Sequence, residues 1–138
     1  MKPLAFALEF HGEAVQLDAG RLRVETQASG GLDGLGDGVA LCRRDIELTD
    51  DGSLTERGEL SFARDDAVTF TARGRLRRSP DPRLRHGTAV LEVTGGRGRL
   101  AGARGFVTSN FLLSDSGELT DYHQGLLFIS SPKEKSTG

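Results

Sequence analysis

Hydrophobic and polar residues alternate with a period of two along much of this chain. Residues 68–76 show the pattern best, because Val68, Phe70, Ala72 and Leu76 occupy alternate positions and threonines and arginines fill the others. Successive side chains of a strand point to opposite faces of a sheet, so the pattern predicts a strand with one buried face. Further strands are predicted over residues 4–11, 39–48, 59–62, 88–93, 106–113 and 119–129.

Turn-forming residues separate these predicted strands. Residues 51–52, 65–66 and 114–117 are Asp, Ser and Gly and are typical of short connections between antiparallel strands. Residues 79–82, Ser-Pro-Asp-Pro, predict a longer loop, because proline has no amide hydrogen to donate to a ladder. We count about seven or eight strands, a number that suits an up-and-down barrel or a sandwich.

Length and composition fit one soluble domain. The chain has 138 residues, 36% of them hydrophobic and 28% charged, and it has no apolar run near the ~18 residues of a membrane span. We expect one β-barrel domain over residues 1–130 and a polar tail over 131–138. The start resembles a signal sequence only briefly, because Glu9 and His11 interrupt it. The single cysteine, Cys42, excludes an internal disulfide and indicates a reducing, cytoplasmic environment.

Net charge and histidine spacing argue against nucleic acid, membranes and metal ions as binding partners. The net charge of −2 gives no electrostatic reason to bind nucleic acid or anionic lipid, so neither nucleic acid nor a membrane is an expected partner. The local basic stretch is interpreted as a solvated strand face; it comprises Arg73, Arg75, Arg77, Arg78, Arg83 and Arg85. The three histidines, His11, His86 and His123, lie on separate segments without ligand spacing, so no metal site is expected.

Two clusters of glycines stand out. Residues 30–38 have a passing likeness to calcium-binding repeats, but such sites need several stacked copies, so a flexible loop at a barrel mouth is favoured. Residues 94–105 contain Gly-x-Gly twice, which could cradle an anion. A dinucleotide site would need a helix next, whereas residues 106–113 read as a strand. The second cluster therefore predicts a sharp strand-to-strand bend.

The second cluster also carries a family resemblance. Gly-Gly-x-Gly-x-Leu-Ala-Gly-Ala-x-Gly followed by a strand resembles the signature of the allene oxide cyclase and dirigent barrel superfamily, over residues 94–113 and with Leu100 where phenylalanine is more usual. The resemblance implies an all-β, calycin-like fold, a single small antiparallel up-and-down barrel of about eight strands. It also implies that an apolar reactive molecule is bound in the barrel and cyclised or isomerised without metal or organic cofactor.

Alternation within the strands selects candidate polar groups. Arg44 falls in the apolar set of its strand together with Cys42, and a buried cation needs an anion. Glu92, Asp121 and His123 are each candidate partners or acid–base groups, and a pair of Arg44 with Glu92 is expected to be either structural, across the barrel, or beside a substrate. Asp121 and His123 share one face of the last strand, but the opposite face is equally apolar, so the pattern leaves open which face lies inside. We predict Arg44, Glu92 and His123 as catalytic residues and Asn110, Asp121, Tyr122, Phe70 and Cys42 as substrate-binding residues.

The leading functional hypothesis is a cofactor-independent cyclase or isomerase acting on an apolar, polyketide-like or fatty-acid-like intermediate. The alternatives are a non-catalytic barrel that binds a small hydrophobic ligand, and an interaction module. A polar cluster in an enclosed cavity would favour the enzyme, and a purely apolar cavity would favour the non-catalytic binding barrel, the carrier alternative. An interior filled with side chains would favour the interaction module. Two apolar faces on residues 119–129 predict that the outer one is covered, so a homo-oligomer, a dimer or a trimer, is expected.

Overall fold

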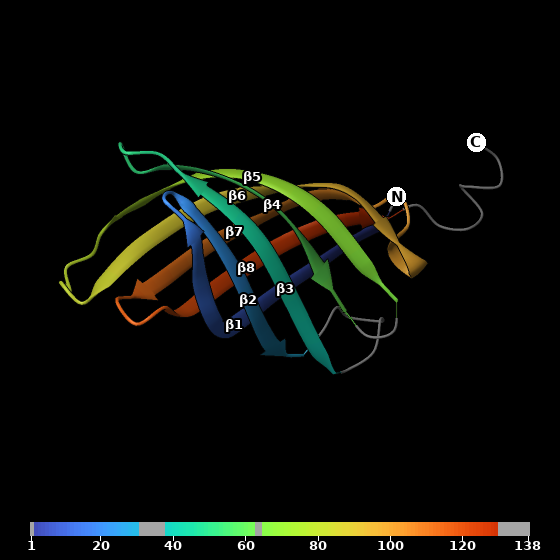
Figure 1. Cartoon of the computed structure of the whole chain (residues 1–138). Coiled ribbons are helices and arrows are strands. Elements are labelled where there is room, and N and C mark those ends of the chain that lie inside the picture. Colours follow the sequence, from blue (N-terminus) through green and yellow to red (C-terminus); the bar gives the residue numbers. More distant parts are fainter. Residues whose placement is uncertain (1, 31–37, 63–64, 130–138) are drawn as a thin grey trace.

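Eight antiparallel strands form one closed barrel in the computed structural model (Figure 1). The structure describes residues 2–30, 38–62 and 65–129. The strands are β1 (Lys2–Asp18), β2 (Arg21–Ser29), β3 (Val39–Leu48), β4 (Ser53–Ser61), β5 (Ala67–Arg78), β6 (Leu84–Arg97), β7 (Arg104–Ser114) and β8 (Glu118–Ile129), and a short 3₁₀ turn, η1 (Gly98–Leu100), joins β6 to β7. The predicted all-β barrel is confirmed.

Some of the predicted segments fall outside the described residues. The polar tail over 131–138 lies there, and so do residues 31–37 of the first glycine cluster. Within the described ranges, no helix is long and apolar enough to cross a membrane. The same ranges hold no group of three or more His, Cys, Asp or Glu side chains arranged to take a metal ion.

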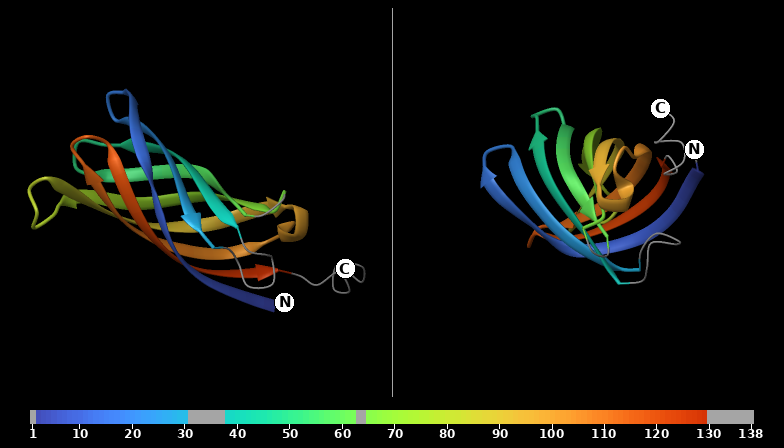
Figure 2. Two further views of the ribbon diagram at one scale, coloured as in Figure 1. Left: turned by 90° about the horizontal axis from the view of Figure 1, so that it is seen from below. Right: turned by 90° about the vertical axis from the view of Figure 1, so that its right-hand side faces the viewer.

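The barrel closes because its first and last strands pair. Each strand pairs with the next in sequence, and β1 pairs with β8 from Lys2↔Ile129 to Glu13↔Glu118. Closure satisfies the backbone donors and acceptors that an open sheet would leave along two edges. The connections after β1, β3, β5 and β7 gather at one end of the barrel, here called the hairpin end, and η1 lies at the other (Figures 1 and 2).

Alternation along each strand places the core inside the barrel. In β5, Val68, Phe70 and Ala72 are buried whereas Thr69 and Thr71 are exposed, as the sequence pattern predicts. Fully buried apolar side chains also come from the seven other strands and η1 and include Phe10, Val24, Ala40, Leu60, Leu91, Leu100, Val107 and Leu127. Each large one contributes about 1.5–3 kcal/mol relative to an exposed side chain.

Aromatic rings lie over interior glycines on neighbouring strands. Phe111 on β7 is paired with Gly87 on β6, and a Cβ added to Gly87 would lie 2.0 Å from the Phe111 ring. Phe6 on β1 covers Gly125 on β8 in the same way, at 2.3 Å. The missing side chains therefore give the rings their room, and the rings fill the interior where the glycines leave space.

The second glycine cluster closes the end of the barrel opposite the hairpin end. Gly98 has a φ of +66°, which favours glycine, and the turn that follows buries Leu100 and Ala103 completely. The buried Asp66 carboxylate accepts hydrogen bonds from the Arg99 amide and Nε, both at 2.8 Å. The predicted bend is confirmed, and its buried Leu100 and Ala103 also close this end of the barrel.

Candidate functional site

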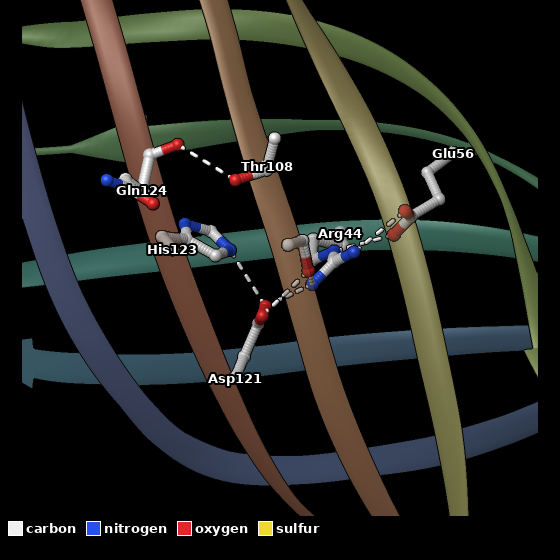
Figure 3. A network of polar contacts seen from close by, with 7 residues as sticks. Arg44, Glu56, Thr108, Asp121, His123 and Gln124 are labelled. Carbon is white, nitrogen blue, oxygen red and sulfur yellow. Dashed lines mark hydrogen bonds and ion pairs between the residues drawn. The ribbon is translucent and has the colours of Figure 1, made fainter.

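Five polar side chains meet in the middle of the barrel. Arg44 comes from β3, Glu56 from β4, Ser109 from β7, and Asp121 and His123 from β8. Figure 3 shows the Arg44 guanidinium between Glu56 and Asp121, with His123 beyond Asp121. The side chains of Arg44, Glu56, Asp121 and His123 are 0% exposed, so the cluster is sealed from solvent.

Arg44 uses all three nitrogens of its guanidinium within the cluster. Nε donates to Glu56 Oε1 at 2.6 Å and Nη2 donates to Glu56 Oε2 at 2.7 Å. Nη1 donates to Ser109 Oγ at 3.3 Å and to Asp121 Oδ2. Burial disfavours the charged form, but the nearby Glu56 and Asp121 carboxylates outweigh it and raise the pKa of Arg44 above its ordinary value. The Phe111 ring, whose centroid lies 5.1 Å from the guanidinium carbon, adds a cation–π contact.

Asp121 accepts hydrogen bonds from three residues. Besides Arg44 Nη1, Ser109 Oγ donates to Asp121 Oδ1 at 2.7 Å, and His123 Nε2 lies 2.8 Å from Oδ2. Burial would raise the pKa of this carboxyl, but the Arg44 charge and the hydrogen bonds more than offset that effect and lower it. Asp121 is therefore a carboxylate held on several sides.

His123 is the member of the cluster with unused hydrogen-bonding capacity. Its ring packs against Phe10, with centroids 4.6 Å apart, and only Nε2 has a polar partner. Nδ1 is buried and has no hydrogen-bond partner among the described residues. An unsatisfied buried polar atom costs free energy, so this nitrogen is where a bound molecule would gain most.

The structure brings three of the predicted residues together and places two more nearby on the inner face. Arg44, Asp121 and His123 form the cluster, whereas Phe70 and Cys42 line the interior. Burial, more than any other influence, raises the pKa of the Cys42 thiol to about 12, so this cysteine is not a nucleophile in the closed barrel.

The other three predicted residues lie on the outer face. Glu92 is exposed because Leu91 and Val93 take the inward positions of β6, so the candidate pairing with Arg44 is wrong for Glu92, whereas the candidate pairing of Asp121 with Arg44 is found. Glu92 instead lines an outer groove of about 890 Å³. The Asn110 carboxamide oxygen lies 3.1 Å from His86 Nε2 on the outside, and Tyr122 is 48% exposed.

Sequence reasoning missed Glu56 and Ser109. The signal for Glu56 was present, because Leu54, Glu56 and Leu60 occupy alternate positions of one strand and a carboxylate in that set is the anion that Arg44 needs. Ser109 lies between the inward-facing Val107 and Phe111 in the same way. The alternation of residues within single strands could not show how the strands pair, and this pairing brings side chains of β3, β4, β7 and β8 to one point.

Comparison with known proteins gives the fold a name. No protein-family model matches the chain, and no curated protein matches its sequence. Solved structures do match its fold, two dirigent proteins among them. The pterocarpan synthase dirigent protein GePTS1 superposes with a TM-score of 0.66 at 14% identity, covering 94% of this chain and 89% of that one. The pterocarpan synthase dirigent protein PsPTS1 gives a TM-score of 0.59 at 11% identity, covering 94% and 97%.

Identities this low show the fold alone. The chain has a dirigent-like eight-stranded barrel, which confirms that part of the resemblance carried by the second glycine cluster. The allene oxide cyclase part of the resemblance stays a prediction.

Proposed function

We propose that this barrel binds a small, largely apolar natural-product intermediate in its interior and promotes its cyclisation without a cofactor. The observation that carries the proposal is the sealed cluster of Arg44, Glu56, Ser109, Asp121 and His123, in which His123 Nδ1 has no partner among the described residues. Buried ion pairs seldom stabilise a fold more than apolar residues of similar volume would, so stability alone accounts poorly for such a cluster. Strongly perturbed buried groups gather at functional sites.

The fold comparison supports the same class of chemistry. The two structures described above are pterocarpan synthase dirigent proteins, and a synthase activity of this kind is what we extend to this chain. The likeness supports the class of reaction and leaves the substrate to be found by experiment.

The cluster is suited to moving a proton during ring closure. Asp121 fixes the His123 ring through Nε2, while Arg44 and Ser109 fix Asp121. His123 Nδ1 would take or return the proton of the reacting group, and the preorganised charges would act in a dry interior where they are strong. Phe10 and Phe111 would form the apolar walls that hold one reactive conformer.

A ligand must enter through one end of the barrel. The end near η1 is plugged by Leu100 and Ala103, which are fully buried. At the hairpin end the inward-facing Leu22 and Leu48 are only half-buried. We propose that the hairpin end opens to admit the ligand, because fewer buried contacts must be broken there.

The proposal is tested by binding and turnover together. Wild-type protein would be screened by ligand-detected NMR against a library of neutral aromatic and polyketide-like fragments and of ring-open precursors. Hits should be lost in His123→Gln and kept in the outer-face control Asn110→Ala. A hit that the wild type also cyclises, and His123→Gln does not, supports an enzyme, whereas binding without turnover supports the carrier alternative. A folded wild type that binds no member of the library would contradict both.

A further inference from the structure

We infer that the hairpin formed by β5 and β6 is a docking surface for a short acidic segment of a partner protein. The hairpin carries the basic stretch that the sequence pattern interprets as a solvated strand face. The inference goes beyond the proposed function, and it does not depend on the polar cluster inside the barrel.

The hairpin concentrates positive charge that the rest of the chain lacks. Residues 73–86 hold six arginines and one aspartate, a net charge of +5, whereas the whole chain carries −2, so the other residues together carry −7. The small net charge of the chain therefore conceals a strong asymmetry. A surface of one sign attracts a partner of the opposite sign within about one Debye length, ~10 Å at moderate salt.

The hairpin projects beyond the neighbouring strands. β4 pairs with β5 only as far as Arg75, so Arg77 and Arg78 have ladder partners on β6 alone. The left view of Figure 2 shows the turn between β5 and β6 extending past the other turns of the hairpin end. All six arginines of residues 73–86 are exposed. A partner can therefore reach these side chains from outside the barrel.

The arginines form a row on the outer face of β5 and a pair at the end of the ladder. Arg73, Arg75 and Arg77 occupy alternate positions of β5, which places them on one face about 7 Å apart. Arg78 and Arg85 are register partners. Like charges directly opposite each other destabilise a ladder, so this pair is an energetic cost to the fold that a bound anion would relieve.

Four of the six arginines have no counter-ion within the described residues. No ion pair and no side-chain hydrogen bond there involves Arg73, Arg77, Arg78 or Arg85. Arg75 donates to the Ser53 hydroxyl at 3.4 Å and to the Asp51 backbone carbonyl at 3.0 Å, and both of these oxygens are uncharged. The row and the pair thus keep their charge for another molecule.

Two acidic side chains of the hairpin end are already engaged. The Asp81 carboxylate, in the turn between β5 and β6, accepts hydrogen bonds from Arg83 Nε at 3.1 Å and from Nη2 at 2.8 Å. The Asp51 carboxylate, in the turn between β3 and β4, accepts from Thr49 Oγ1 at 2.5 Å and from the Ser53 amide at 2.9 Å. These carboxylates therefore do not neutralise the free arginines.

The composition of the hairpin favours a protein segment over nucleic acid or a membrane. Guanidinium groups bind carboxylates through paired hydrogen bonds. Proteins that bind single-stranded nucleic acid stack bases on aromatic rings, and interfacial membrane segments insert large apolar side chains. Residues 73–86 contain no Phe, Tyr or Trp and expose no large apolar side chain. A long polyanion would also extend over the acidic remainder of the molecule, whereas a short segment with carboxylates about 7 Å apart fits the row alone.

An acidic probe peptide tests the inference. Labelled wild type would be titrated with a peptide of four Glu-Ser repeats and followed by ¹H–¹⁵N NMR, with four Lys-Ser repeats as the control peptide. The acidic peptide should shift the amides of residues 73–86, and its binding should weaken as salt screens the charges. An exposed ion pair contributes up to about fivefold in affinity, so Arg73→Ser combined with Arg77→Ser should weaken binding about tenfold. Arg43→Ser combined with Arg104→Ser gives the same net charge and should bind as the wild type does. Absence of shifts at low salt, or equal losses in both double variants, would overturn the inference.

Arg85→Glu separates binding from folding. The substitution places an anion opposite Arg78, so the Tm should equal or exceed that of the wild type, while the acidic peptide should bind at least about tenfold more weakly. Unchanged binding by this variant would overturn the inference. An eight-nucleotide oligothymidine and phosphatidylserine vesicles would be measured under the same conditions. Tighter binding of either one than of the acidic peptide at residues 73–86 would overturn the choice of an acidic protein segment as the partner.

Discussion

Arg44 and Glu56 are joined by two parallel hydrogen bonds in the interior of the barrel, although they do not face each other in the ladder. The register partner of Arg44 on β4 is Gly58, and Glu56 reaches the guanidinium from two positions away along that strand. The pair fixes two of the three guanidinium nitrogens and leaves only Nη1 for Asp121 and Ser109. Glu56 thereby sets which edge of Arg44 meets the Asp121–His123 pair.

Removal of Glu56 should therefore be costly. Glu56→Ala leaves Arg44 buried with half of its hydrogen bonds, and we expect a loss of about 3–5 kcal/mol in the free energy of unfolding by urea denaturation. Glu59→Ala on the same strand is the control, because Glu59 pairs with Arg97 at the surface and should cost under about 1 kcal/mol. Equal losses for the two variants would show that the buried pair has no special role.

The stability of the barrel should depend on pH through Asp121. The folded-state pKa of Asp121 lies below the ordinary value of about 4, so its contribution to stability is complete above that value and is lost as pH falls through the folded-state pKa. Wild type and Asp121→Asn should therefore converge in unfolding free energy as the pH is lowered below 4. Asp51 and Asp81, each with a pKa of about 2, titrate in both proteins and cancel in the comparison.

The titration of Asp121 can also be observed without a variant. Its carboxyl ¹³C shift in the wild type should change with a midpoint below 3.8, the ordinary value of the group. A midpoint at or above that value would contradict the assignment of Asp121 as the clamped carboxylate of the cluster.

The ring of Phe111 should make Gly87 intolerant of a side chain. A methyl group at Gly87 would lie 2.0 Å from that ring, so Gly87→Ala should destabilise the protein by about 1–3 kcal/mol. Gly95→Ala on the same strand is the control, because its nearest contact would be 3.6 Å away, and it should change stability by less than about 0.5 kcal/mol. Thermal unfolding measures both, and Phe111→Leu should restore part of the loss in the Gly87→Ala background.

The outer face of β7 and β8 leads to a prediction about assembly. Phe106 and Leu126 are register partners there, 57% and 43% exposed, and Phe128 lies beside them. We propose that a second copy of the chain covers this apolar face, because contiguous exposed apolar patches mark interaction sites. Sedimentation should show an oligomer for the wild type and a monomer for Phe106→Glu. A monomeric wild type at high micromolar concentration would contradict the proposal.

The sequence pattern predicted the fold better than it predicted the site. Alternation put Arg44, Cys42 and Phe70 on inward faces, and the glycine cluster located the bend before β7, because these features depend on neighbours along the chain. The anion that binds Arg44 depends on which strands meet, and alternation in β6 alone could not show that Glu92 lies outside while Glu56 from β4 lies inside. On β8 both faces are apolar, so the sequence did not show which face lies inside the barrel. The structure shows it, because pairing with β1 places Asp121 beside the buried Phe10.

Closure of the barrel has a consequence for how the chain reaches this state. The ladder between β1 and β8 joins segments from opposite ends of the described chain, so β1 has only β2 as a neighbour until β8 arrives. During that interval the free edge of β1, which carries Leu4, Phe6, Leu8 and Phe10, is a template for pairing with other molecules. Folding yield should therefore depend on protein concentration far more than the stability of the finished barrel does.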